Sequence, residues 1–226
     1  MCCWPPACSG DGRNPLPPER RPIVCYVTDR RAFSLASGSA SNHPSAPYTQ
    51  PLHDSIRRAA AAGAALIQIR EKDLDARPLL DLVRFAVAAT QESGARVLVN
   101  DRLDVALAAG AAGVHLGENS LPPETVSEWR RCAGRPEFLI GVSCHSLESC
   151  RHAARGGANY VFFGPVFATP SKAAFGPPQG LERLREACRA IEIPVLAIGG
   201  ITAENFQSCL DAGAAGIAAI RWFQEP

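Results

Sequence analysis

One short motif decides the fold: AGAAGV at 109–114, which recurs as AGAALI at 62–67, GGANYV at 156–161 and AGAAGI at 212–217. The second residue of each copy is glycine, which suits the left-handed position that ends a helix, and an apolar run typical of a strand follows at once. These glycines, at positions 63, 110, 157 and 213, are 47, 47 and 56 residues apart. A period near 47 residues has room for two short strand–helix units, so four such double units, one for each copy of the motif, predict eight strands.

Between the repeated motifs, β-rich runs alternate with helix-like stretches. The expected strands are 23–27, 65–69, 96–99, 113–116, 138–141, 160–163, 195–198 and 216–219. The expected helices are 52–62, 76–93, 103–109, 122–132, 147–155, 179–190 and 203–212. Strict alternation indicates a parallel sheet with crossover helices. Eight strands predict an α/β fold, a single (β/α)8 TIM barrel with a truncated last helix. The alternative is an open doubly wound sheet, but its glycine-rich fingerprint is missing after the first strand, where the chain reads VTDR at 27–30.

Two stretches do not fit the alternating pattern. Residues 1–21 hold five prolines and no apolar period, which indicates a disordered leader. Residues 34–51 are rich in serine, alanine and proline, which indicates a low-complexity loop insertion. The predicted organisation is therefore a leader at 1–21 and a barrel at 22–226 that carries an insertion at 34–51.

Composition excludes several classes of protein. The 226 residues are 46% hydrophobic with a net charge of +1, which argues against global disorder and against an electrostatic nucleic-acid binder. No apolar run approaches the roughly 18 residues of a membrane span, and no secretory signal is visible. The nine cysteines are scattered without a CxxC pair, which indicates reduced thiols and a cytoplasmic protein. The sequence leaves open whether the chain forms a homo-oligomer.

The chemistry of a TIM barrel lies at the carboxyl ends of its strands, so the residues that follow each run are the candidates. Gln68 and Arg70 share one face of the second run, and Lys72 follows at its end. Two cations at the barrel mouth predict a site for an anion. The alternative is an ion-pair network in which Glu71 and Asp73 neutralise them.

Polar residues also follow the third, fourth and fifth runs. Asn100 and Asp101 after the third run suit Mg²⁺ or a polar substrate, although an aspartate there could instead cap the next helix. His115 in the fourth run alternates with apolar neighbours, which is compatible with a place inside the barrel wall. Ser143 and His145 alternate after the fifth run, but no GxSxG elbow supports a hydrolase.

The last three loops carry groups that suit phosphate. Glycines let backbone amides approach a phosphate closely, and the loops after strands seven and eight are the usual phosphate site of this barrel. Together with the first two cations, these loops predict one monophosphate and a second set of anionic oxygens, such as a diphosphate. A solvated loop is the alternative for the first of them. The candidates are Thr169, Ser171 and Lys172, then Gly199 and Gly200, then Ile220 and Arg221.

Seven motifs in order, between residues 22 and 223, resemble the thiamine phosphate synthase/thiazole tautomerase family. They read YVTDR at 26–30, QIREK at 68–72, VNDR at 99–102, GVHLG at 113–117, GVSCH at 141–145, GPVF at 164–167 through Lys172, and PVLAIGGI at 194–201. For a synthase, the resemblance implies a transferase that joins hydroxymethylpyrimidine diphosphate to hydroxyethylthiazole phosphate and releases pyrophosphate in thiamine biosynthesis.

The resemblance also implies roles for the candidate residues. Asp101 would bind Mg²⁺, Gln68 and Ser143 would line the pyrimidine pocket, and Gly200 with the backbone of 220–221 would hold the thiazole phosphate. The residues that would hold the pyrophosphate are Arg70, Lys72, Asn100, Thr169, Ser171 and Lys172.

Three departures from the synthase pattern keep alternatives open. Ser120 stands where synthases carry the aspartate that is their second Mg²⁺ ligand, and Arg221 replaces a usual serine. His145 matches the general acid/base of the metal-independent thiazole tautomerase branch. The retained Arg70, Lys72 and Asp101 favour the synthase. A non-catalytic phosphate-binding regulator on the same barrel is the third hypothesis.

Overall fold

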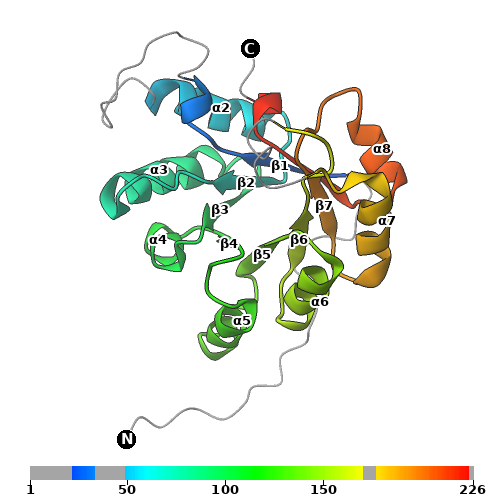
Figure 1. Ribbon diagram of the computed structural model, residues 1–226. Coiled ribbons are helices and arrows are strands. Elements are labelled where there is room, and N and C mark those ends of the chain that lie inside the picture. Colours follow the sequence, from blue (N-terminus) through cyan, green and yellow to red (C-terminus); the bar gives the residue numbers. More distant parts are fainter. Residues whose placement is uncertain (1–21, 34–48, 170–176, 224–226) are drawn as a thin grey trace, which may run out of the picture.

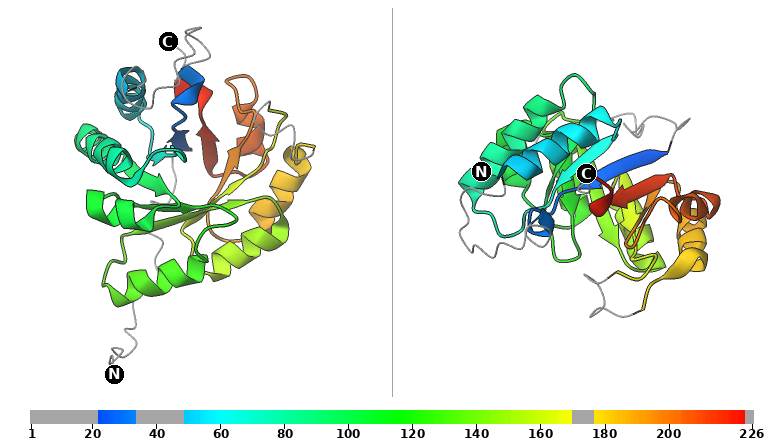
Figure 2. Two further views of the ribbon diagram at one scale, coloured as in Figure 1. Left: turned by 60° about the vertical axis from the view of Figure 1, so that its left-hand side comes forward. Right: turned by 90° about the horizontal axis from the view of Figure 1, so that it is seen from above.

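The computed structural model describes residues 22–33, 49–169 and 177–223. Eight parallel strands close into a barrel in the order of the sequence, and β8 pairs with β1. The helices surround the ring of strands, as two further views also show (Figures 1 and 2). The predicted (β/α)8 barrel is therefore confirmed and the open sheet is wrong.

The boundaries of the elements follow the expected alternation. The strands are β1 Ile23–Val27, β2 Leu66–Ile69, β3 Arg96–Asn100, β4 Gly113–Leu116, β5 Leu139–Cys144, β6 Tyr160–Phe163, β7 Val195–Ile198 and β8 Gly216–Ala219. The helices are α2 Thr49–Ala61, α3 Ala76–Ala89, α4 Leu103–Ala109, α5 Pro123–Cys132, α6 Leu147–Arg155, α7 Gly180–Ala190 and α8 Phe206–Asp211. A single 3-10 turn, η2 Arg221–Phe223, follows β8 in the described chain, where the truncated last helix was expected.

The repeated glycines have the conformation that the motif requires. All four have positive φ angles, between 69° and 101°. Each lies between the end of a helix and the start of the next strand, where a residue with a β-carbon would be strained. The repeat therefore works as a helix stop, and its recurrence sets the count of strands.

Several boundaries differ from those expected. Helix α2 begins at Thr49, so residues 49–51 of the expected insertion form its first turn. Helix α3 ends at Ala89 rather than at 93, because the hydroxyl of Thr90 bonds the carbonyl oxygens of the preceding turn. Strand β5 runs on to Cys144, because residues 141–144 pair with β6. Residues 1–21 and 34–48 lie outside the described chain, so the leader and most of the insertion remain predictions.

Two apolar layers hold the barrel together. One lies between the strands and the helices, and the other fills the interior, where Leu98, Leu139, Tyr160, Phe162 and Leu196 are all buried. Towards the carboxyl ends of the strands the inward positions become polar. Those positions are Gln68, Asn100, His115 and Ser143. The apolar floor and polar rim place the site at one end of the barrel.

None of the described helices is long and apolar enough to cross a membrane. The cysteines in the described ranges are free thiols, as expected.

Candidate active site

The two cations after β2 are not neutralised by their acidic neighbours. Arg30 instead forms a bidentate pair with Asp73, at 2.5 and 2.9 Å, and its backbone N–H donates to both carboxylate oxygens of Glu71, at 3.1 and 3.2 Å. Within the described ranges, neither Arg70 nor Lys72 makes an ion pair. The alternative of an ion-pair network around Arg70 and Lys72 is therefore wrong for this part of the chain, and both side chains are available to an anion.

A buried threonine orients the chain as it leaves β2. Thr28 is fully buried, accepts a hydrogen bond from the N–H of Arg70 at 2.9 Å and donates its own N–H to the carbonyl of Gln68 at 2.9 Å. Burial raises the pKa of Glu71, whereas hydrogen bonds from Thr28 and Arg30 act against that rise. The hydrogen bond from Arg30 holds the pKa of Asp73 well below its usual range.

The sequence analysis does not predict that Thr28 and Arg30 position the segment after β2. The signal that could have indicated it is their place directly after the first strand, inside the YVTDR motif.

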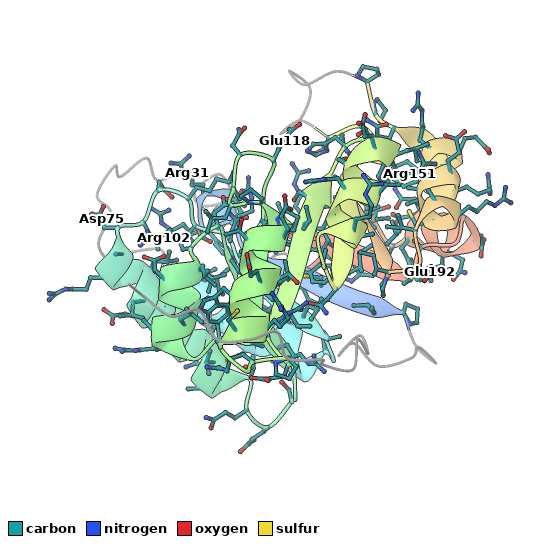
Figure 3. The ribbon with its side chains drawn as sticks, turned by 90° about the horizontal axis from the view of Figure 1, so that it is seen from below. Arg31, Asp75, Arg102, Glu118, Arg151 and Glu192 are labelled. Atoms are coloured by element: carbon teal, nitrogen blue, oxygen red, sulfur yellow. The ribbon has the colours of Figure 1, made fainter. Side chains whose placement is uncertain are left out.

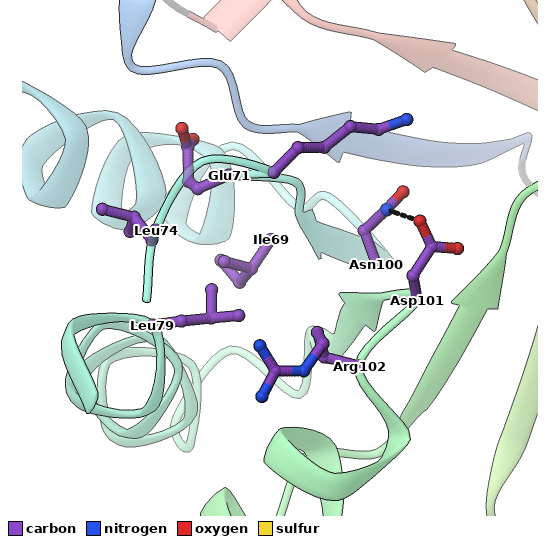
Figure 4. A pocket seen from close by; sticks show the side chains of 8 residues that line it. Ile69, Glu71, Leu74, Leu79, Asn100, Asp101 and Arg102 are labelled. Atoms are coloured by element: carbon purple, nitrogen blue, oxygen red, sulfur yellow. Dashed lines mark hydrogen bonds between the residues drawn. The ribbon is translucent and has the colours of Figure 1, made fainter. Parts of the chain in front are cut away.

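A chain of polar side chains crosses the mouth from β2 to β3. The amide nitrogen of Gln68 donates to Oδ1 of Asn100 at 2.8 Å. The amide nitrogen of Asn100 in turn donates to Oδ2 of Asp101 at 2.6 Å, as Figure 4 shows. Asp101 has a φ of 60°, which aspartate tolerates better than most residues. Arg102, not Asp101, is the N-cap of α4, so the helix-cap alternative for Asp101 is wrong.

The carboxylate of Asp101 also receives donors from the loop after β4. The N–H of Gly117 donates to Asp101 at 3.0 Å and to Ser120 at 2.6 Å, and the hydroxyl of Ser120 donates to Asp101. No group of three histidine, cysteine, aspartate or glutamate side chains that could hold a metal occurs in the described ranges. Glu118 is exposed and points away from the barrel, so it does not replace the missing carboxylate (Figure 3).

This donor set fits Mg²⁺ as a partial site. Mg²⁺ takes hard oxygen ligands and is commonly bound by one or two carboxylates together with substrate phosphates. The carboxylate of Asp101 and the hydroxyl of Ser120 supply such oxygens next to one another. The site therefore needs oxygens from a phosphorylated ligand to complete the coordination.

His115 lies inside the barrel, between two hydroxyl groups. Its Nδ1 is 3.0 Å from the hydroxyl of Tyr160 and its Nε2 is 2.9 Å from that of Ser143. Burial lowers the pKa of His115 to about 3, and Arg70 acts in the same direction while Asp101 opposes it. Ser143 thus reaches both the interior and the mouth.

The low pKa of His115 predicts a loss of stability in acid. The unfolded chain takes up a proton near pH 6.5, whereas the folded chain does so only near pH 3. The contribution is therefore complete above pH 6.5 and falls as the pH decreases towards 3. From pH 7.5 to pH 5 we expect the free energy of unfolding to fall by about 2 kcal/mol through this group.

Urea denaturation of the wild type and of His115→Gln at both pH values measures this contribution. The variant should lose less stability between them, by about that amount. An equal loss in both proteins would contradict the prediction.

The ring of His145 is held in one tautomer by the backbone. Its Nδ1 lies 2.5 Å from the carbonyl oxygen of Gly164, which can only accept, so the proton sits on Nδ1. Nε2 is therefore unprotonated in the neutral ring and can act as a base. His145 is half-buried and follows directly after β5.

The turn after β7 requires both of its glycines. Gly199 and Gly200 have φ angles of 95° and 66°, and a β-carbon would lie 2.6 Å from Pro165 or 2.7 Å from the carbonyl oxygen of Ala168. The side chain of Asn205 holds this turn by donating to the carbonyl of Gly200 at 2.9 Å. Among the described residues, no acceptor bonds the N–H of Gly200, which is free to meet a phosphate.

Three of the remaining candidate residues lie within the described chain. Ile220 and Arg221 follow β8, and Arg221 is exposed at the start of η2. Thr169 is half-buried in the loop after β6. Ser171 and Lys172 lie outside the described residues, so their part in an anion cradle remains a prediction.

A cavity of about 250 Å³ adjoins the polar chain. The residues that line it include Lys72, Asn100 and Asp101 as well as the apolar Ile69 and Leu79. Figure 4 shows this pocket from close by. Fold and site together define a (β/α)8 barrel whose mouth carries two cations beside a chain of hydrogen-bonded polar side chains.

Comparison with known proteins identifies the family. The model of the family described as thiamine monophosphate synthase matches residues 41–223. The thiamine-phosphate synthase of Roseiflexus castenholzii is 44% identical over 208 residues, which cover 92% of this chain and 83% of that one. The thiamine-phosphate synthase of Methanoculleus marisnigri is 50% identical over 167 residues, covering 74% and 77%.

The solved structure of thiamine phosphate pyrophosphorylase from Pyrococcus furiosus has a TM-score of 0.71 at 35% identity, covering 87% of this chain and 84% of that one. The chain therefore belongs to the thiamine monophosphate synthase family, which confirms the resemblance inferred from the seven motifs.

Proposed function

We propose that this protein is a thiamine phosphate synthase. It would join hydroxymethylpyrimidine diphosphate to hydroxyethylthiazole phosphate and release pyrophosphate. The observation that carries the proposal is the pair of cations Arg70 and Lys72, which have no ion-pair partner among the described residues, beside the Gln68–Asn100–Asp101 chain. Family membership and the names of the relatives support the same activity.

The proposed reaction breaks the C–O bond between the pyrimidine methylene and the diphosphate, and the electron pair leaves with pyrophosphate. The thiazole nitrogen then forms a C–N bond to the pyrimidine cation. Arg70 and Lys72 stabilise the charge that develops on the leaving oxygens, which is preorganised electrostatic catalysis. Gly200 and the backbone at 220–221 hold the thiazole phosphate, and Gln68 and Ser143 contact the pyrimidine.

Mg²⁺ belongs to this proposal as a partner of the diphosphate. Asp101 and Ser120 would hold it, and when bound it supplies further positive charge next to the leaving group. Asn100 orients the Asp101 carboxylate through its 2.6 Å hydrogen bond. Ser120 contributes a neutral oxygen where a second carboxylate would carry charge, so we expect weak binding of the metal by the protein alone.

The test is an assay for pyrophosphate with both substrates and Mg²⁺. Pyrophosphate should form together with thiamine phosphate in equal amounts, and only when the thiazole phosphate is present. Absence of both products under these conditions would overturn the proposal.

Thiazole tautomerase is the second candidate, because the hydrogen bond to Gly164 prepares His145 for proton transfer. That activity needs no metal, and Ser120 removes a metal ligand. In this case His145→Ala should abolish aromatisation of the thiazole carboxylate phosphate, and EDTA should leave the rate unchanged. Binding of a thiazole phosphate without turnover in either assay would instead favour a non-catalytic regulator.

A further inference from the structure

Three hydrogen-bonded side chains connect the barrel interior to the mouth. Tyr160 on β6 contacts His115 on β4 at 3.0 Å, and His115 contacts Ser143 on β5 at 2.9 Å. Tyr160 and His115 are 0% and 1% exposed, whereas Ser143 is half-buried. Neither buried ring has a part in the reaction proposed above.

Their neighbours fix the positions of both rings. His115 packs on Phe162 with ring centroids 4.2 Å apart. A β-carbon at Gly141 would collide with the Tyr160 ring and with Nδ1 of His115, so the glycine makes room for their contact. These contacts hold the imidazole between the two hydroxyl groups.

The hydrogen positions in the Tyr160–His115–Ser143 hydrogen-bond chain can be assigned by counting donors and acceptors. The buried imidazole is neutral and carries one proton, on Nδ1 or on Nε2. A proton on Nδ1 would be donated to the Tyr160 oxygen, and the phenol hydrogen would then lack an acceptor among the described residues. Such an orphaned donor is costly in a site without solvent. With the proton on Nε2, the phenol donates to Nδ1 and the imidazole donates to Ser143.

We propose that Tyr160 is a positioning residue that fixes His115 in its Nε2–H tautomer and so makes Ser143 a hydrogen-bond donor towards the substrate. Because the Ser143 oxygen already accepts from His115, its own proton is directed to a ligand. The group that it suits is an acceptor, such as an unprotonated ring nitrogen of a pyrimidine. This last step rests on the proposed function, since it takes the pyrimidine to lie at Ser143.

Nitrogen NMR of the imidazoles tests the tautomer without any substrate. In the ¹⁵N-labelled wild type, His115 should show a protonated Nε2 and an unprotonated Nδ1, with the assignment taken from the spectrum of His115→Gln. In Tyr160→Phe the unprotonated Nδ1 loses the donor that it bonds in the wild type, so its ¹⁵N signal should shift away from the wild-type position. A wild-type Nδ1–H tautomer would overturn the proposal, and so would an unchanged Nδ1 signal in Tyr160→Phe.

Kinetics tests the consequence for binding. Tyr160→Phe should raise KM for the pyrimidine diphosphate about tenfold, with a smaller change in kcat and none in KM for the thiazole phosphate. The matched control is Tyr26→Phe, which removes a buried hydroxyl bonded to Ser55 at 2.8 Å between barrel and helix, and should change neither KM.

Equal rises of both KM values in Tyr160→Phe would indicate general loosening and would overturn the positioning role. Should the wild type make no pyrophosphate, the proposed function fails while the NMR result still decides the tautomer. If Tyr160→Phe does not fold, the wild-type spectrum alone remains decisive.

Discussion

Replacement of Lys72 by alanine should slow the release of pyrophosphate by about 10²- to 10³-fold, the usual cost of removing one preorganised group that stabilises a developing charge. Lys72 is exposed at the end of β2 and has no ion-pair partner within the described ranges. Its charge is therefore available to the leaving group. The loss should appear mainly in kcat, because negative charge increases on the leaving oxygens in the transition state.

Two further variants make this experiment specific. Lys72→Arg keeps the charge and should retain more activity than Lys72→Ala, although it changes the geometry. Arg77→Ala removes an exposed cation from the first turn of α3 and should leave the rate unchanged. Steady-state assays of pyrophosphate measure all three. A Lys72→Ala rate within a few-fold of the wild type would contradict the proposed role.

The fold could be predicted because its signals are local. A glycine that ends a helix and the apolar strand after it lie within six residues of each other, so AGAAGV at 109–114 can be interpreted without any tertiary information. The direction of the strands then places every strand end at the same end of the barrel. That step alone brings Gln68, Asn100 and Ser143 to one rim.

The partners of the site residues could not be predicted, because they come from distant parts of the chain. Their neighbouring positions suggested that Glu71 and Asp73 pair with Arg70 and Lys72. Instead, Arg30, more than forty positions away, bonds both carboxylates. Glu71 is buried whereas its neighbour Lys72 is exposed, so adjacent side chains in this loop face different surroundings.

The contacts of His115 with two hydroxyl groups could not be predicted from the sequence for a related reason. Whether His115 meets Tyr160 and Ser143 depends on the register of three strands around a closed barrel. The predicted end of the fifth strand at 141 also stopped short of Ser143. Residues 142–144 belong to β5 because its pairing with β6 continues.

Replacement of Ser120 by aspartate should make the protein bind Mg²⁺ more tightly, so that it is active at lower Mg²⁺ concentrations. The hydroxyl of Ser120 donates to Asp101, so an aspartate there would bring a second carboxylate next to the first. Without metal the two charges repel, and with Mg²⁺ both become ligands. We expect the Mg²⁺ concentration for half-maximal activity to fall about tenfold.

Thermal unfolding separates this gain from a general effect of the substitution. In EDTA the Ser120→Asp protein should melt below the wild type, and Mg²⁺ should raise its melting temperature more than that of the wild type. Ser120→Asn is the control, because asparagine has nearly the shape of aspartate but no charge, and it should show neither effect. The same Mg²⁺ dependence in all three proteins would mean that Asp101 and position 120 do not share a cation. The metal of the proposed reaction would then be held by the diphosphate and by residues other than Ser120.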